Sequence, residues 1–139
     1  MITASVRYEV PFYDVDTYRI VYHGNYPKYF ELARCKLLET IGYSYAEMEA
    51  SGFLFPVIEM QIKYVHPLLF RQVVDIEARL VSWENKLVFR YLISDAEAHT
   101  RLTKGMTSQV AISMPERITQ FKSPDVLRNA VKHHLESVA

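Results

Sequence analysis

Two carboxylates and a histidine lie within one short segment, residues 13–26, and these residue types can perform acid–base or nucleophilic chemistry. Asp14 and Asp16 come first, and His23 lies just before a predicted helix that begins near Asn25. The first N–H groups of a helix lack partners within the helix and carry partial positive charge, so they can stabilise an oxyanion. A carbonyl bound there would become electrophilic, and a nearby carboxylate could activate water or attack directly. Spacing alone leaves open the alternative that the Asp residues only form a turn or a cap.

The helix that would position this segment is predicted over residues 25–40. Apolar side chains recur there every three or four residues, and charged side chains lie mostly on the opposite face. Asn25 is the expected N-cap, Pro27 is tolerated in the first turn, and Gly42 is expected to end the helix.

Five further segments alternate apolar and polar residues, which is the pattern of half-buried strands. They are residues 6–12, 57–65, 74–80, 87–93 and about 100–113. Pro11 indicates a sheet edge or a strand end. The segments 57–65 and 74–80 predict antiparallel strands, each with one wetter face.

Two more helices are predicted downstream of the long one. Ser44 and Glu47 have capping-box spacing, and Gly52 follows the short helix that they begin. Ser123 and Asp125 flank a proline and predict the start of a terminal amphipathic helix, with Ser123 as its cap.

One strand, one long helix and then a run of antiparallel strands is an α+β order, in which the apolar face of the sheet can wrap the helix. No repeat or linker divides the chain, so residues 1–139 are expected to form a single domain.

Composition excludes several classes of function. The 139 residues contain 16 Lys+Arg and 16 Asp+Glu, whereas a protein that coats nucleic acid needs an excess of cations. The four glycines form neither a Walker loop nor a GxGxxG fingerprint. Cys35 is the only cysteine, which excludes an intrachain disulfide and, with no leader segment apparent, predicts a reducing, cytoplasmic setting. No apolar run approaches the roughly 20 residues of a membrane span.

The run from Tyr13 to Arg34 reads Tyr-Asp-x-Asp-x-x-x-Ile-Val-Tyr-His-x-Asn-Tyr-x-x-Tyr-Phe-Glu-x-Ala-Arg. It closely resembles the signature of hot-dog-fold acyl-CoA thioesterases of the 4-hydroxybenzoyl-CoA thioesterase type, including the Tol-Pal-associated branch. Weaker similarity follows at residues 64–67 with Asp75 and at residues 83–86. The resemblance implies a hot-dog fold, an antiparallel β-sheet wrapped around a long central α-helix, with a C-terminal helix.

The resemblance also implies roles for individual residues. Asp16 matches the catalytic carboxylate, which acts as nucleophile or as general base towards water. The main-chain N–H of His23 matches the oxyanion donor, and Gly24 beside it allows close approach. This agrees with the role expected for a helix start on physical grounds. Tyr22, Gly24 and Asn25 match substrate-binding positions.

Three further assignments keep an alternative open. Glu31 matches a position that faces the acyl group, but it could simply pair with Arg34 or Lys28 on the helix. Lys86 matches a basic turn residue near the CoA phosphates, but it could be a solvated lysine. The His23 side chain could also bind the substrate or the catalytic carboxylate.

The chain departs from the pattern at Tyr18-Arg19, where relatives commonly have Gly before the Ile/Val-Val pair. Arg19 could narrow the site, pair with Asp14 or Asp16, or meet an anionic group of the substrate. Cys35 is expected to pack rather than to react. No metal and no other cofactor is expected, because the histidines lack the spacing of metal ligands.

The sequence therefore predicts a thioesterase that hydrolyses an acyl-CoA, or an acyl carrier protein thioester, to the free acid and the thiol. The resemblance implies homodimers, usually paired into homotetramers, and an uncovered sheet edge gives a physical reason for association. A non-catalytic protein that binds acyl thioesters or assists assembly is the alternative from another class. A hydratase of the same fold is a minor alternative, because its His-containing motif is absent. Neither a nucleic-acid partner nor a membrane span is expected.

Overall fold

The computed structural model describes residues 2–138. Its helices are α1 (Tyr26–Thr40), α2 (Tyr45–Ala50) and α3 (Asp125–Ser137), with short 3-10 turns η1 (Phe12–Asp14) and η2 (His23–Asn25) before α1. Its strands are β1 (Ile2–Glu9), β2 (Phe53–Leu54), β3 (Val57–Tyr64), β4 (Val73–Ser82), β5 (Leu87–Asp95), β6 (Arg101–Gln109), β7 (Ile112–Ser113) and β8 (Ile118–Thr119). No helix among residues 2–138 is long and apolar enough to cross a membrane.

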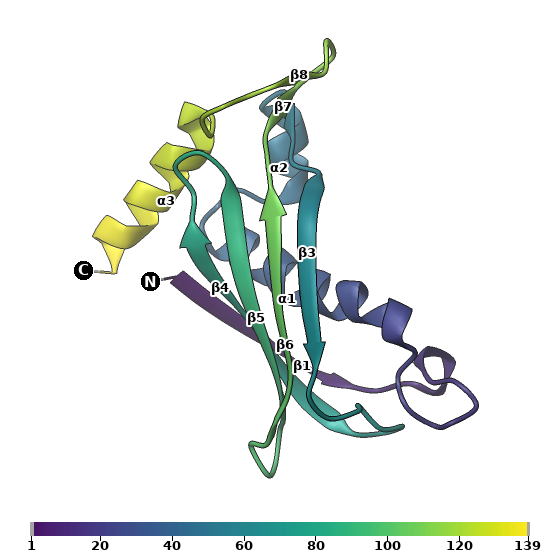
Figure 1. Cartoon of the computed structure of the whole chain (residues 1–139). Coiled ribbons are helices and arrows are strands. Elements are labelled where there is room, and N and C mark those ends of the chain that lie inside the picture. Colours follow the sequence, from purple (N-terminus) through teal and green to yellow (C-terminus); the bar gives the residue numbers. More distant parts are fainter. Residues whose placement is uncertain (1, 139) are drawn as a thin grey trace.

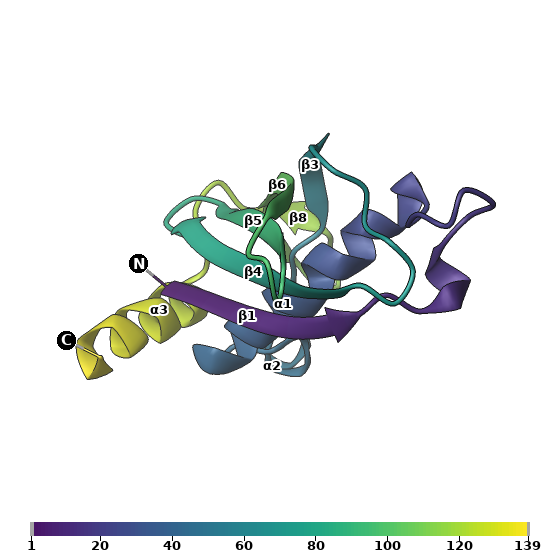
Figure 2. The ribbon, with the colours of Figure 1, turned by 90° about the horizontal axis from the view of Figure 1, so that it is seen from below.

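An antiparallel five-stranded sheet in the order β1-β4-β5-β6-β3 forms the main layer. The sheet curves around α1, which contacts β1 and β4 most closely (Figures 1 and 2). A smaller sheet, β2-β7-β8, lies near α2, and α3 lies at the side of the main sheet. The expected α+β arrangement of a sheet wrapped around one long helix is therefore confirmed.

The core lies between α1 and the inner face of the sheet. Alternate residues of β4 and β5 point inward and are buried, as the period-two pattern predicts. Phe30 of α1 stacks on Tyr91 of β5, with ring centroids 4.4 Å apart and planes at 8°. Gly105 of β6 makes this packing possible, since a Cβ there would overlap the Phe30 ring. The helix comes this close to the sheet only because position 105 has no side chain.

Three boundaries differ from the predictions. The first strand ends at Glu9, and Phe12 lies in η1 with 72% of its surface exposed rather than on the buried face. The segment 100–113 is two strands, β6 and β7, which belong to different sheets. Ser123 does not cap α3: Pro124 holds the N-cap position and the buried Ser123 hydroxyl has no partner among residues 2–138. The capping role predicted for Ser44 is confirmed, because its hydroxyl accepts from the Glu47 N–H.

Strand β3 differs from the expected one-sided pattern. It is an edge strand that pairs, within residues 2–138, with β6 alone. Nearly every residue of β3 is exposed, including Ile58 and Met60, whose side chains were predicted to be buried. Alternation identified the strand, but only its C-terminal half packs against the core, through the partly buried Ile62 and through Tyr64 against Tyr26.

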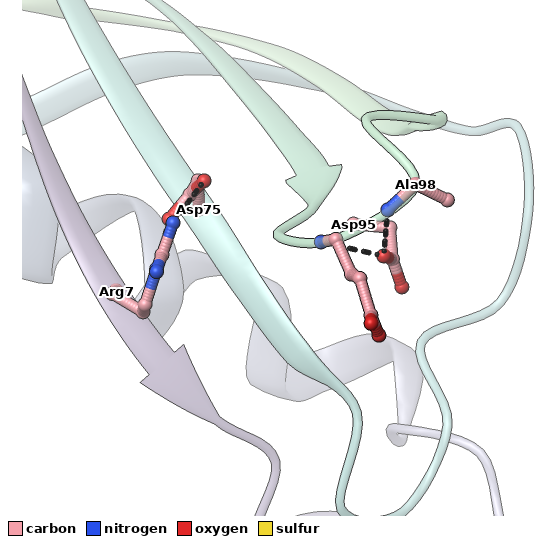
Figure 3. Close-up of polar contacts among 5 residues, drawn as sticks. Arg7, Asp75, Asp95 and Ala98 are labelled. Atoms are coloured by element: carbon pink, nitrogen blue, oxygen red, sulfur yellow. Dashed lines mark hydrogen bonds and ion pairs between the residues drawn. The ribbon is translucent and has the colours of Figure 1, made fainter.

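Polar contacts hold the end of the sheet near β1 (Figure 3). The Arg7 guanidinium on β1 donates to both Asp75 oxygens on β4, at 2.9 and 3.2 Å, and this holds the pKa of Asp75 below its usual value. Asp95 closes the turn after β5 by accepting from the N–H groups of Glu97 and Ala98. The carboxylates of Asp75 and Asp95 are both solvated, so we expect these contacts to add little to the free energy of unfolding.

Gly105→Ala should destabilise the fold by about 1–3 kcal/mol, because the new methyl group forces Phe30 off Tyr91. Urea unfolding of the variant measures this loss. Phe30→Leu removes the clashing ring, so the double variant should lose less stability than the sum of the two single variants. Strict additivity would contradict the packing constraint.

Candidate active site

The segment between β1 and α1 is a structured loop, not an open connection. Val15 and Val21 form an antiparallel bridge, and Ile20 forms another with Leu69. The Val21 N–H also donates to the Leu68 carbonyl at 2.9 Å. The loop is thereby fastened to the segment that enters β4, and it leads through η2 directly into α1 (Figure 1).

Asp14 is buried and fully engaged. One carboxylate oxygen pairs with the Lys28 ammonium, and the other accepts from the Tyr29 hydroxyl at 2.8 Å. Its main-chain carbonyl accepts from the Tyr22 N–H at 3.0 Å and from the Asn25 side-chain amide at 2.9 Å. This residue therefore ties the start of the loop to its end and to the first turn of α1.

Asp16 has a different environment. It is partly exposed, and one carboxylate oxygen accepts from the Tyr18 N–H at 2.8 Å. Its own N–H donates to the Ile20 carbonyl at 3.0 Å, which fixes its backbone within the loop. The second carboxylate oxygen has no hydrogen-bond partner among residues 2–138. Of the two acids, only Asp16 has a carboxylate oxygen free to act on a ligand.

The start of the helix is open at His23. Its main-chain N–H finds no acceptor among residues 2–138, while its carbonyl accepts from the Tyr64 hydroxyl at 2.9 Å. Tyr64 also packs edge-on against Tyr26, with centroids 4.6 Å apart, so β3 holds the helix start in place. Gly24 lies close to the exposed Tyr22 ring: a Cβ there would lie 2.5 Å from a ring carbon, so a side chain at this position would displace the ring.

The remaining predicted site residues are placed less directly. The exposed His23 imidazole lies against the Tyr22 ring at 4.3 Å, and within residues 2–138 it does not bond Asp16. Asn25 holds the N-cap position of α1 but makes no side-chain cap bond, since its backbone is helical (φ −89°, ψ −10°) rather than extended; its side-chain NH2 donates to the Asp14 carbonyl. Glu31 is exposed, with its Oε1 3.7 Å from Nη2 of Arg34.

Lys86 does not join the site within one chain. It lies in the exposed turn between β4 and β5, at the opposite end of the sheet from the 13–25 loop (Figure 1). The ten residues of β4 separate the two regions, a length of roughly 33 Å at the rise of an extended strand. A ligand at the helix start could meet a lysine of this turn only from another subunit.

Arg19 lies in the loop with a left-handed backbone conformation. Its φ is 62°, a left-handed conformation that glycine adopts freely and other residues adopt at a cost. Among residues 2–138 it forms no ion pair with Asp14 or Asp16, so the pairing considered for it is not realised. The turn therefore has at its exposed tip an arginine in a backbone conformation that favours glycine.

Sequence patterns did not identify Lys28, Tyr29 and Tyr64 as supporting residues. Their signal was only indirect, since Lys28 and Tyr29 lie in the first turn of a helix preceded by acids. Burial raises the pKa of the Cys35 thiol, and Glu39 and Glu31 raise it further, which fits the prediction that Cys35 packs rather than reacts. No cluster of His, Cys, Asp or Glu that could hold a metal lies within the described part of the chain.

Comparison with known proteins identifies the class. Residues 10–131 match the thioesterase-like superfamily, and the chain belongs to that family. A Bacillus subtilis protein, YneP, provisionally named an acyl-CoA thioesterase, is 33% identical over 86 residues, 61% of this chain and 62% of that protein. The acyl-CoA thioester hydrolase YbgC of Escherichia coli is 30% identical over 100 residues, 70% of this chain and 75% of YbgC.

A solved structure supports the fold. The DHNA-CoA thioesterase of Staphylococcus aureus superposes with a TM-score of 0.86, covering 99% of this chain and 91% of that one, at 24% identity. That likeness concerns the fold, and it confirms the hot-dog arrangement. Together, family and relatives confirm that the chain is an enzyme of the thioesterase class.

Tyr29→Phe should weaken the anchor of the loop. It removes a hydrogen bond to a buried carboxylate, which should cost about 1.5–3 kcal/mol at neutral pH in urea unfolding. Burial, and next the bond to Asp14, raise the pKa of Tyr29 above its ordinary value of 10.0. The folded protein holds this proton more tightly, so its contribution is complete below pH 10.0 and is lost as the pH rises towards the folded pKa. As the pH rises above 10.0, the free energy of unfolding should therefore fall less in the variant than in the wild type.

Tyr13→Phe is the matched control, because Tyr13 is 69% exposed. It should leave the stability at neutral pH unchanged. Equal behaviour of the two variants would show that the Asp14–Tyr29 bond does not anchor the loop.

Proposed function

We propose that residues 1–139 act as one acyl-CoA thioesterase domain that hydrolyses the thioester to the free acid and CoA, with Asp16 and the helix start at His23 as its reaction centre. The observation that carries this proposal is the pairing, on one anchored loop, of a carboxylate with a free oxygen and a helix-start N–H without an acceptor. The thioesterase family and the names of the relatives support the reaction type.

The reaction needs each of these groups. The thioester carbonyl oxygen would accept from the His23 N–H, and the helix start would stabilise the negative charge that develops on it. Asp16 would take a proton from water as the water attacks the carbonyl carbon, or would attack directly to give an anhydride that water then hydrolyses. In either route the carbon–sulfur bond breaks and the CoA thiolate leaves, taking up a proton. Both roles of Asp16 remain within the proposal.

Exposed aromatic and aliphatic side chains surround this loop. Tyr18 and Tyr22 lie on it, and Leu69 and Phe70 lie on the segment bonded to it, all at least 45% exposed. Such an apolar surface suits an acyl group or a second subunit. The single Cys35 is compatible with the reducing, cytoplasmic setting that we propose for the protein.

A homodimer through the edge of β3 would cover the rest of this surface. Ile58 and Met60 of β3 are 55% and 42% exposed, and the outer backbone edge of β3 is free within residues 2–138. A second β3 related by a two-fold axis would satisfy that edge and bury these side chains. Tyr64 ends the same strand, so the dimer would be continuous with the site. Pairing of such dimers into tetramers is part of the proposal.

Asp16→Asn should lower kcat by about 100- to 10,000-fold, because the amide can neither accept the proton nor attack. The measurement is free-thiol release from benzoyl-, phenylacetyl-, short-chain and long-chain acyl-CoAs. Thr17→Ala, at the exposed neighbouring position, should retain activity. Unchanged turnover in Asp16→Asn would exclude Asp16 as the catalytic group. No turnover of any substrate by folded wild type would instead favour the binding or assembly role.

Met60→Glu should break the dimer, since a two-fold axis near the middle of β3 brings both new carboxylates close together. Light scattering on a sizing column should show a shift towards monomer, with a parallel loss of turnover. Val126→Glu on α3 is the control, with an equally exposed apolar side chain at 41%. A wild type that is monomeric at micromolar concentration would refute the proposed interface.

A further inference from the structure

The outer face of the main sheet, away from α1, carries a concentration of cations. Two shallow hollows of about 220 and 260 Å³ adjoin there and share Arg90, Lys104 and Gly105. Lys63 lines the first, and Arg79 and Arg101 line the second. We call Lys63, Arg79, Arg90, Arg101 and Lys104 the basic patch. Glu77 is the one acid that lines either hollow.

The strand register places like charges opposite each other in the basic patch. Arg79 of β4 pairs with Arg90 of β5, and Lys63 of β3 pairs with Lys104 of β6. Like charges in directly opposed positions destabilise a sheet. Of the five cations in the basic patch, only Arg79 has a carboxylate within 4 Å among residues 2–138, that of Glu77 at 3.7 Å. Because the whole chain balances 16 basic with 16 acidic residues, this excess is local, and an external anion would relieve it.

The chemistry of the surface selects among anions. The part of its floor that β4, β5 and β6 form consists of strands paired on both sides, so it offers no nest of free amides for a phosphate. The charges sit on long, exposed side chains spread over four strands. A second copy of this chain would oppose the same cations across a two-fold axis. Carboxylates spread over an acidic protein surface fit this arrangement better than a compact phosphate or another subunit.

The patch reaches the proposed site at the end of β3. Lys63 is followed directly by Tyr64, whose hydroxyl holds the His23 carbonyl on the other face of the sheet. A protein seated on the outer face could pass a flexible arm around this strand end to the helix start. We propose that the basic patch docks an acidic acyl carrier protein, which delivers its thioester to Asp16; this inference rests on the proposed function.

The test combines Lys63→Glu, Arg90→Glu and Lys104→Glu in one variant. Its matched control carries Lys36→Glu, Lys122→Glu and Lys132→Glu, three exposed cations outside the basic patch. The probe is a purified, unacylated holo acyl carrier protein of net negative charge, and its Kd is measured by fluorescence anisotropy at low and high ionic strength. The wild type and the control should bind it in a salt-sensitive manner, and the patch variant should bind at least about tenfold more weakly.

Kinetics with one acyl group on two carriers completes the test. The patch variant should raise KM for the carrier-bound thioester while leaving KM for the acyl-CoA within about twofold. An equal rise in both KM values would overturn the proposal, because the patch would then hold the CoA phosphates. The proposal also fails if the wild type does not bind the carrier, or if the patch is needed only for vesicles rich in phosphatidylglycerol. Should the charge reversals prevent folding, the corresponding Gln variants make the same comparison.

The two proposals can fail separately. If the carrier binds through the basic patch but no thioester is hydrolysed, the proposed thioesterase activity is refuted and the proposed docking surface is supported. Hydrolysis of acyl-CoA without carrier binding would do the reverse.

Discussion

The ion pair between the buried Asp14 and the half-exposed Lys28 is the constraint on which the candidate site depends. A carboxylate taken out of water is tolerated only when it is paired and hydrogen-bonded, and here Lys28 and the Tyr29 hydroxyl serve its two oxygens. Both partners come from the first turn of α1. If the loop moved, the Asp14 carboxylate would therefore become exposed or lose its partners. Because the Asp14 carbonyl also binds the Tyr22 N–H and the Asn25 amide, one residue fixes both ends of the loop.

The two acids illustrate how environment divides roles between identical side chains. Both carboxylate oxygens of the buried Asp14 already have a protein partner, whereas Asp16 uses one oxygen for a local turn and presents the other. The same loop accepts a left-handed backbone at Arg19 and places Gly24 close against the Tyr22 ring. The contacts of Asp14, the hydrogen bond to Leu68 and the bridge to Leu69 offset the unfavourable free energy of this loop conformation. Preorganised polar groups of this kind need little rearrangement when charge develops on a ligand.

The features that could be predicted from sequence are those set by local patterns. Alternation in β4 and β5 and helical spacing in α1 report which side is buried, so the main elements and their order were predictable. The exposure of β3 was not, because it depends on which strand lies at the sheet edge. Ser123 has the right spacing for a cap, yet Pro124 takes that position. Distinguishing Asp16 from Asp14 required the family resemblance, and the distance of Lys86 from the loop follows only from the length of β4.

The edge and the outer face of the sheet can bind different partners, because the backbone groups and the side chains of β3 point in different directions. Pairing at the edge of β3 runs through backbone groups in the plane of the sheet, whereas Lys63 projects perpendicular to it. Joining two copies at this edge would therefore leave both basic patches uncovered and bring the two Lys63 side chains onto one extended surface. Such a surface concentrates positive charge further, and an acidic carrier would have more reason to bind the dimer than the monomer. The oligomer and the docking surface are thus compatible, and each strengthens the physical case for the other.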